Sequence, residues 1–80
     1  MQTSLILPDL ELPAQTMRLG LWLVGLGKDV VQGQPLVEII AGAAVVDLPS
    51  PVDGKLVEKL VDEDTAVGPG AVLAIIESTD

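Results

Sequence analysis

Few residues in this chain could carry chemistry. The sequence contains no cysteine and no histidine, which removes the thiolate, the commonest general base and the commonest metal ligand. Twelve acidic residues and four cations remain, and they include no nucleophile with an adjacent base. We therefore expect no enzymatic activity and no catalytic residue within these 80 residues.

Three groups of residues could still form a binding or reactive site. Asp62-Glu63-Asp64 could hold a hard cation, but the run lacks EF-hand spacing and is more typical of a solvated turn. Asp47 and Asp53 lack a further polar group that would make them a catalytic pair. Gly25 and Gly27 precede neither a Lys-Ser/Thr pair nor a helix, so they form no phosphate loop. We expect no metal site.

Charge and composition exclude other function classes. The formal net charge is −8, whereas nucleic acids and anionic membranes bind basic surfaces. No apolar run approaches the roughly 20 residues of a membrane span, and no basic region leads into an apolar N-terminal stretch. We expect a protein of the cytoplasm or an organelle matrix. Trp22, the only aromatic residue, is expected to be packed or half-buried rather than to serve as a ligand platform.

The hydropathy pattern predicts an all-β chain. Met17, Leu19, Leu21 and Leu23 alternate with other residues at the period of a strand that has one face in the core. Glycine and proline recur too often for a helix. Six strands are predicted, over residues 3–7, 16–23, 36–40, 45–48, 55–61 and 72–76.

The second half of the chain repeats the first at an offset of 37 residues. The matched pairs are Leu23 with Leu60, Val30 with Val67, Gly33 with Gly70, and Leu36 with Leu73. One such half cannot bury an apolar face alone, but two halves related by a pseudo-twofold axis can. We therefore predict a flattened barrel with internal duplication.

These segments resemble the biotinyl/lipoyl domain family, most closely the lipoyl domains of 2-oxo acid dehydrogenase acyltransferases. The resemblance covers about residues 5–77 and implies a single domain over 1–80. It also implies a barrel-sandwich hybrid of two four-stranded antiparallel sheets. The matching segments are Leu7-Pro8-Asp9-Leu10, Trp22-Leu23-Val24, Gly27-Lys28-Asp29-Val30, Gly33 to Ile39, Pro49 to Gly54, and Glu63 to Val67.

In this family a lysine at a hairpin tip between the two halves carries lipoic acid or biotin through an amide bond. Counting from either flanking segment places Ala43 at that position, within Ile40-Ala41-Gly42-Ala43-Ala44. The family's Gly-Glu-Gly loop, which the fold places near the tip, corresponds to Glu11-Leu12-Pro13. Because both neighbouring segments differ while the scaffold residues are kept, natural divergence explains the change better than one engineered substitution.

The resemblance implies an accessory or protein-interaction domain of a 2-oxo acid dehydrogenase-type complex, without a bound cofactor. Its partners would be proteins of that complex, and the isolated domain is expected to be monomeric. Leu12, Pro13, Ala41, Gly42 and Ala43 would form the contact end. The competing interpretation is that Ile40 and Leu12 only cap the core.

Two other functions remain open. The domain could be a working lipoyl or biotinyl carrier whose lysine was removed by engineering or is replaced by Lys28, Lys55 or Lys59; only then would lipoate be a cofactor. It could also be the barrel module of a membrane-fusion adaptor, although the short segment Ala41–Ala44 leaves no room for the long helical insertion usual there.

Overall fold

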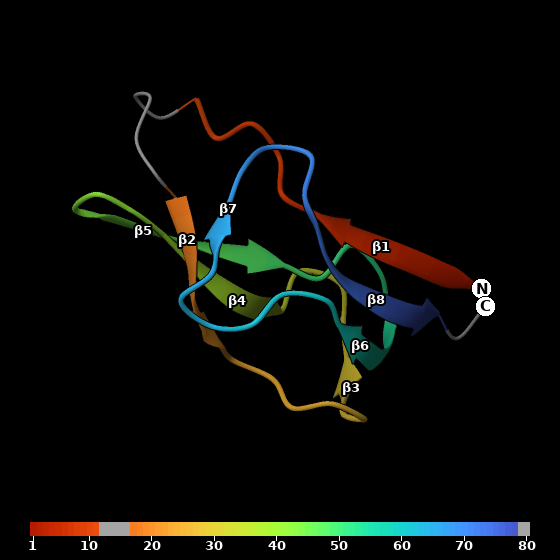
Figure 1. The fold of residues 1–80 in the computed structure, drawn as a ribbon. Helices are drawn as coiled ribbons and strands as arrows, with labels where there is room; N and C mark the ends of the chain where they lie inside the picture. The colour runs from red at the N-terminus through yellow and green to blue at the C-terminus, as the bar shows by residue number, and fades with distance from the viewer. Residues whose placement is uncertain (12–16, 79–80) are drawn as a thin grey trace.

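The computed structural model describes residues 1–11 and 17–78 of the chain. Within them the chain forms two four-stranded antiparallel sheets, with strand orders β1-β8-β6-β3 and β5-β4-β2-β7 (Figure 1). This confirms the predicted all-β barrel-sandwich. The strands are β1 (Gln2–Ile6), β2 (Met17–Trp22), β3 (Asp29–Val30), β4 (Pro35–Ala41), β5 (Ala44–Pro49), β6 (Gly54–Lys59), β7 (Ala66–Val67) and β8 (Val72–Ser78).

Aliphatic side chains from both sheets meet in one core. The strands β4 and β8 have a neighbour on both sides and carry the most buried residues, as expected for strands covered by the opposite sheet. Large residues with no exposed surface include Leu7, Leu19, Leu36, Ile39, Leu56, Leu73 and Ile76. No described residue lies in a helix that could cross a membrane.

The predicted duplication extends to the bounds of the strands. The strands β2, β3 and β4 fall on β6, β7 and β8 at an offset of 37 residues, and each pair begins and ends at equivalent positions. The sheet orders exchange when the halves are exchanged. Backbone hydrogen bonds repeat as well: the Gly27 amide donates to the Leu56 carbonyl, and the equivalent Asp64 amide donates to the Leu19 carbonyl. A strand of each half therefore accepts a backbone hydrogen bond from the turn of the other half.

The first strands of the halves follow a different offset. Leu5 pairs with Ala74 as Leu48 pairs with Val37, which places β1 on β5 at an offset of 43 residues. The connection from β1 to β2 is therefore six residues longer than the connection from β5 to β6. This longer connection contains residues 12–16, which lie outside the described part of the chain.

The simple alternation predicted for residues 16–23 is wrong beyond Leu19. The pairing of β2 with β4 shifts between Leu19 and Leu21, and such a bulge changes which residues face the core. Leu21 and Leu23 are consequently 48% and 40% exposed, while Trp22 packs against the core. The two-residue strands β3 and β7 are too short to show a period and are not among the six predicted segments; they are the remaining two of the eight strands that the resemblance implies.

The start of β1 and the end of β8 lie at the opposite end of the molecule from the β4–β5 hairpin (Figure 1). These two strand ends are held together, because the Ser78 amide donates to the Met1 carbonyl at 2.7 Å. The strand β8 thus extends two residues beyond the predicted strand 72–76 and ends at Ser78. A connection to further chain would therefore leave the hairpin free.

Candidate functional site

The β4–β5 hairpin closes with a two-residue turn. Ala41 and Ala44 form the last pair of the ladder, so Gly42 and Ala43 make the turn. Gly42 has a φ of 61°, which glycine adopts without strain, and glycine at the first turn position is typical of a type II′ turn. The tight turn projects the exposed methyl group of Ala43 from the end of the hairpin.

The structure separates the residues predicted for the contact end. Gly42 and Ala43 are exposed, whereas Ala41 is only 7% exposed and belongs to the core. Leu12 and Pro13 lie outside the described residues. Ala41 thus supports the hairpin from within and offers a partner almost no surface.

Sequence reasoning missed one apolar residue beside this tip. Val45 is 58% exposed and lies opposite Ile40 on the outer face of the sheet. Ile40 is half-buried and lies over Gly20, where an added Cβ would come within 2.6 Å of the Ile40 Cδ1 atom. Ile40 therefore points outward instead of capping the core. The exposure of Val45 depends on which residues of β5 face the core, and the sequence pattern does not determine this.

The lysines lie away from the hairpin. Lys28 belongs to the turn between β2 and β3, where its carbonyl accepts a bond from the Leu56 amide. Lys55 and Lys59 lie on β6, and the Lys59 Nζ atom lies 5.2 Å from the centre of the Trp22 ring. The strand predicted over 55–61 is thus confirmed for Lys55 and Lys59, and none of the three lysines lies at the tip.

Comparison with known proteins identifies the scaffold. A family model described as "Biotin-requiring enzyme", of the biotin/lipoyl type, matches residues 10–76. The chain belongs to the biotin/lipoyl domain family.

The curated relatives of this biotin/lipoyl domain include acyltransferase components. The chain is 36% identical over 74 residues to the acetyltransferase component of the pyruvate dehydrogenase complex of Corynebacterium glutamicum, covering 92% of this chain and 11% of that protein. It is 35% identical over 78 residues to the succinyltransferase component of the 2-oxoglutarate dehydrogenase complex of Bartonella vinsonii subsp. berkhoffii, covering 98% and 19%. The chain thus spans less than a fifth of either relative.

A solved structure shares the fold. It is a single-chain, multi-domain long-chain acyl-CoA carboxylase, and its likeness to this chain has a TM-score of 0.78 at 22% sequence identity. The match covers 99% of this chain and 7% of the carboxylase. Both kinds of relative are much larger proteins in which a domain of this size is one part.

The acidic run of this biotin/lipoyl domain stabilises a turn. A Glu63 carboxylate oxygen accepts a bond from the Trp22 amide at 3.0 Å, and Asp64 has a φ of 68° at the position equivalent to Gly27. An Arg18 guanidinium nitrogen lies 3.8 Å from an Asp64 carboxylate oxygen. Among the described residues no group of His, Cys, Asp or Glu could hold a metal ion. Glu63 and Asp64 of the second half therefore contact Trp22 and Arg18 of β2.

The remaining candidates also have structural roles. Trp22 is half-buried, as predicted, and its Nε1 donates to the Val61 carbonyl at 3.1 Å. Asp53 accepts a bond from the Gln32 amide at 2.7 Å, while Asp47 faces outward on β5 opposite Glu38. The two carboxylates therefore stabilise or flank strands and do not converge on a reactive centre.

Proposed function

We propose that this chain is a lipoyl-like domain without a carrier lysine, which acts as an accessory protein-interaction module of a 2-oxo acid dehydrogenase-type complex. The observation that carries the proposal is Ala43 at the tip of the β4–β5 hairpin. A carrier needs a primary amine at an exposed tip to form the amide with its acyl group. The methyl group of Ala43 cannot form one.

A second segment supports the same proposal. In the resemblance, the glycine-rich loop of the carriers begins at Glu11. Here Glu11 has a φ of 55°, a left-handed conformation that glycine adopts freely and a glutamate does not. The backbone conformation suited to glycine is thus occupied by another residue. This fits natural divergence of the whole end and not the loss of one side chain.

The proposed action is recognition by shape. Gly42 and Ala43 form a small, uncharged tip, and the exposed Val45 adds apolar area beside it. In the proposal Leu12 and Pro13 complete this contact end. Proteins of the complex are the partners, because both acyltransferase relatives are named as components of such complexes.

A charge placed at the tip tests this role. The purified components of the host's 2-oxo acid dehydrogenase complexes would be titrated into the domain and followed by calorimetry. Ala43→Asp should weaken the strongest interaction by at least about tenfold, because a carboxylate would lose its hydration in an apolar contact. Val31→Asp is the matched control, since Val31 is 60% exposed and lies outside the hairpin. Unchanged affinity of Ala43→Asp, or no binding by any component, would refute the proposal.

A further inference from the structure

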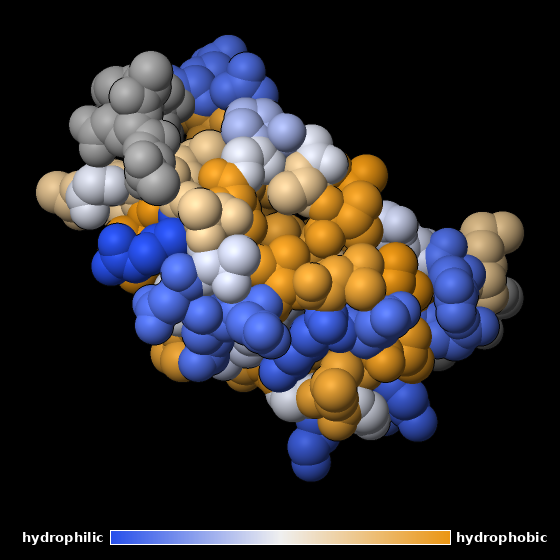
Figure 2. Space-filling model, viewed as in Figure 1, coloured by the Kyte–Doolittle hydropathy of each residue, from blue (hydrophilic) through white to orange (hydrophobic). Residues whose placement is uncertain are grey.

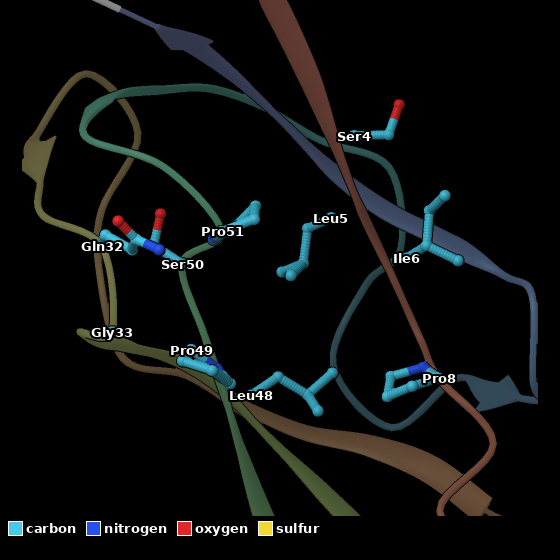
Figure 3. A pocket seen from close by; sticks show the side chains of 10 residues that line it. All are labelled: Ser4, Leu5, Ile6, Pro8, Gln32, Gly33, Leu48, Pro49, Ser50 and Pro51. Carbon is cyan, nitrogen blue, oxygen red and sulfur yellow. The ribbon is translucent and has the colours of Figure 1, made fainter.

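A groove opens between the edge strands of the two sheets. It has a volume of about 500 Å³, and Leu5 and Leu48 point into it from opposite sides (Figure 3). Both leucines are at most 5% exposed and form its floor. None of the lining residues is charged; they are Ser4, Leu5, Ile6, Pro8, Gln32, Gly33, Leu48, Pro49, Ser50 and Pro51.

The duplication explains why this groove exists. Leu5 and Leu48 are equivalent in the two halves, as are Pro8 and Pro51 at the same offset of 43 residues. The groove therefore lies on the pseudo-twofold axis, where β1 and β5 face each other as the edges of separate sheets. The groove is also distinct from the hairpin tip, because Leu48 lies five residues along β5 from Ala43, or about 16 Å of extended chain.

The strand β1 presents free backbone groups at this edge. The Met1 carbonyl accepts a bond from β8, and bonded residues alternate along an antiparallel pair. The backbone amides and carbonyls of Thr3 and Leu5 therefore face β8. The backbone amide and carbonyl of Ser4 face away from β8. Proteins usually protect such an edge with a charge or a proline. Within Gln2–Ile6 there is neither, whereas β5 carries Asp47 and ends in Pro49.

The surroundings of the groove are acidic. Asp47 precedes the lining residue Leu48, Asp9 follows Pro8, and Asp53 accepts the Gln32 amide. All three carboxylates are exposed. The side-chain cations lie elsewhere: Lys28 in the β2–β3 turn, and Arg18, Lys55 and Lys59 on β2 and β6. The N-terminal ammonium of Met1 is paired with Glu77 at 3.4 Å. With a net charge of −8, the domain would attract basic polypeptide and repel acidic polypeptide.

We propose that this groove binds an extended, apolar segment of a partner protein flanked by lysine or arginine. The segment pairs with the free edge of β1 as an added strand, places apolar side chains over Leu5 and Leu48, and brings its cations to the acidic rim. Strand addition of this kind derives affinity from main-chain bonds and specificity from alternate side chains. The proposal does not depend on the hairpin tip, because the two surfaces are separate.

The test is an NMR titration of the ¹⁵N-labelled domain at low salt. The probe is the peptide acetyl-Lys-Val-Thr-Val-Thr-Val-Lys-amide, and the matched peptide carries Glu in place of both Lys residues. The lysine peptide should shift the amide signals of Ser4, Ile6 and Leu48 in a saturable manner. The glutamate peptide should bind at least about tenfold more weakly, since its charges face an acidic rim.

Two variants and a matched control for each identify the binding mode. Ser4→Pro removes the edge-facing amide without breaking the β1–β8 ladder, and should weaken binding about fivefold, the change expected for one hydrogen bond. Ser4→Ala keeps that amide and should bind like the unaltered domain. Ile6→Lys should weaken binding, because it places a cation at the lining of the groove. Leu26→Lys alters charge equally at a residue that is 58% exposed and does not line the groove, and should have no effect.

Several results would overturn the proposal. No saturable shift up to millimolar peptide, shifts centred on other strands, or equal binding of both peptides would each contradict it. Shifts of β1 signals with protein concentration alone would show that the occupant is a second copy of this chain. Ala43→Asp should bind the peptide normally, so loss of tip binding and loss of groove binding can be distinguished.

Discussion

Replacing Gly54 by alanine tests the close packing of the β6 backbone against the β8 backbone. Gly54 is buried at the start of β6, opposite Ser78 of β8. A Cβ atom there would clash with the carbonyl oxygen of Glu77 and lie 2.9 Å from its carbonyl carbon. Both atoms belong to the backbone of the central strand β8, so relief requires a shift of the β6–β8 ladder.

The expected loss of stability follows from this clash. Overpacking a well-ordered interior costs about 1–3 kcal/mol, and a backbone contact places Gly54→Ala at the upper end of that range. Alanine also restricts the unfolded chain, which offsets about 0.4–1 kcal/mol. A net loss of about 2–2.6 kcal/mol would lower the Tm of a domain of this size by roughly 8–20 °C.

Urea and thermal unfolding, followed by circular dichroism and Trp22 fluorescence, would measure this loss. Gly68→Ala is the matched control, because nothing lies within 4 Å of a Cβ there and its φ lies outside the left-handed range. The control should be neutral or slightly stabilising. If Gly54→Ala were as stable as Gly68→Ala, the packing of β6 against β8 described above would be wrong.

Four further substitutions test the duplication and the contacts of Trp22. Gly33→Ala and Gly70→Ala should destabilise the domain equally, by about 1–2 kcal/mol each, because both residues have a φ of 89° in open space; unequal urea midpoints would contradict their equivalence. Trp22→Phe should cost about 1–3 kcal/mol in urea unfolding, because it leaves the half-buried Val61 carbonyl without its donor; a change below about 0.5 kcal/mol would show that this bond is not needed. Lys59→Met should alter the emission of the only tryptophan while costing at most about 1 kcal/mol; an unchanged spectrum would place the ammonium group away from the ring.

Much of the fold could be predicted because the two halves of the chain repeat the same sequence pattern. The repeat of Leu36 at Leu73 and of Gly33 at Gly70 marks equivalent backbone positions. Agreement between the two halves is stronger evidence for the fold than the hydropathy period of either half alone. The prediction failed where one residue changes the phase of a strand. The bulge before Leu21 depends on pairing with β4, and the alternation along β2 contains no sign of it.

The surfaces were harder to predict than the fold. Counting from the two flanking segments that resemble the family places Ala43 at a tip, and the hairpin register agrees. The burial of Ala41 and the exposure of Val45 depend on which face of each strand meets the core, and a short alanine-rich segment has too little pattern to show this. The groove could not be predicted at all, because its lining combines three connections and two edges that meet only in the folded chain.

The surface also shows where the two halves differ. Ile6 and Val72 form a pair on the outer face of the sheet and are 51% and 39% exposed. Their equivalents in the other half are Pro49 and Pro35. An apolar area with hydrophilic residues beside it is visible on the face that Figure 2 presents. The two halves therefore have the same arrangement of strands but expose different side chains on their outer faces.

We propose that this biotin/lipoyl domain carries no acyl group, because Ala43 occupies the position of the carrier lysine. Mass spectrometry of the intact domain and of Ala43→Lys, each co-expressed with a lipoate ligase and supplied with lipoate, tests this proposal. The unaltered domain should gain no mass, and Ala43→Lys should gain one lipoyl group on the introduced lysine. A lipoyl group on Lys28, Lys55 or Lys59 of the unaltered domain, or an unmodified Ala43→Lys, would contradict it.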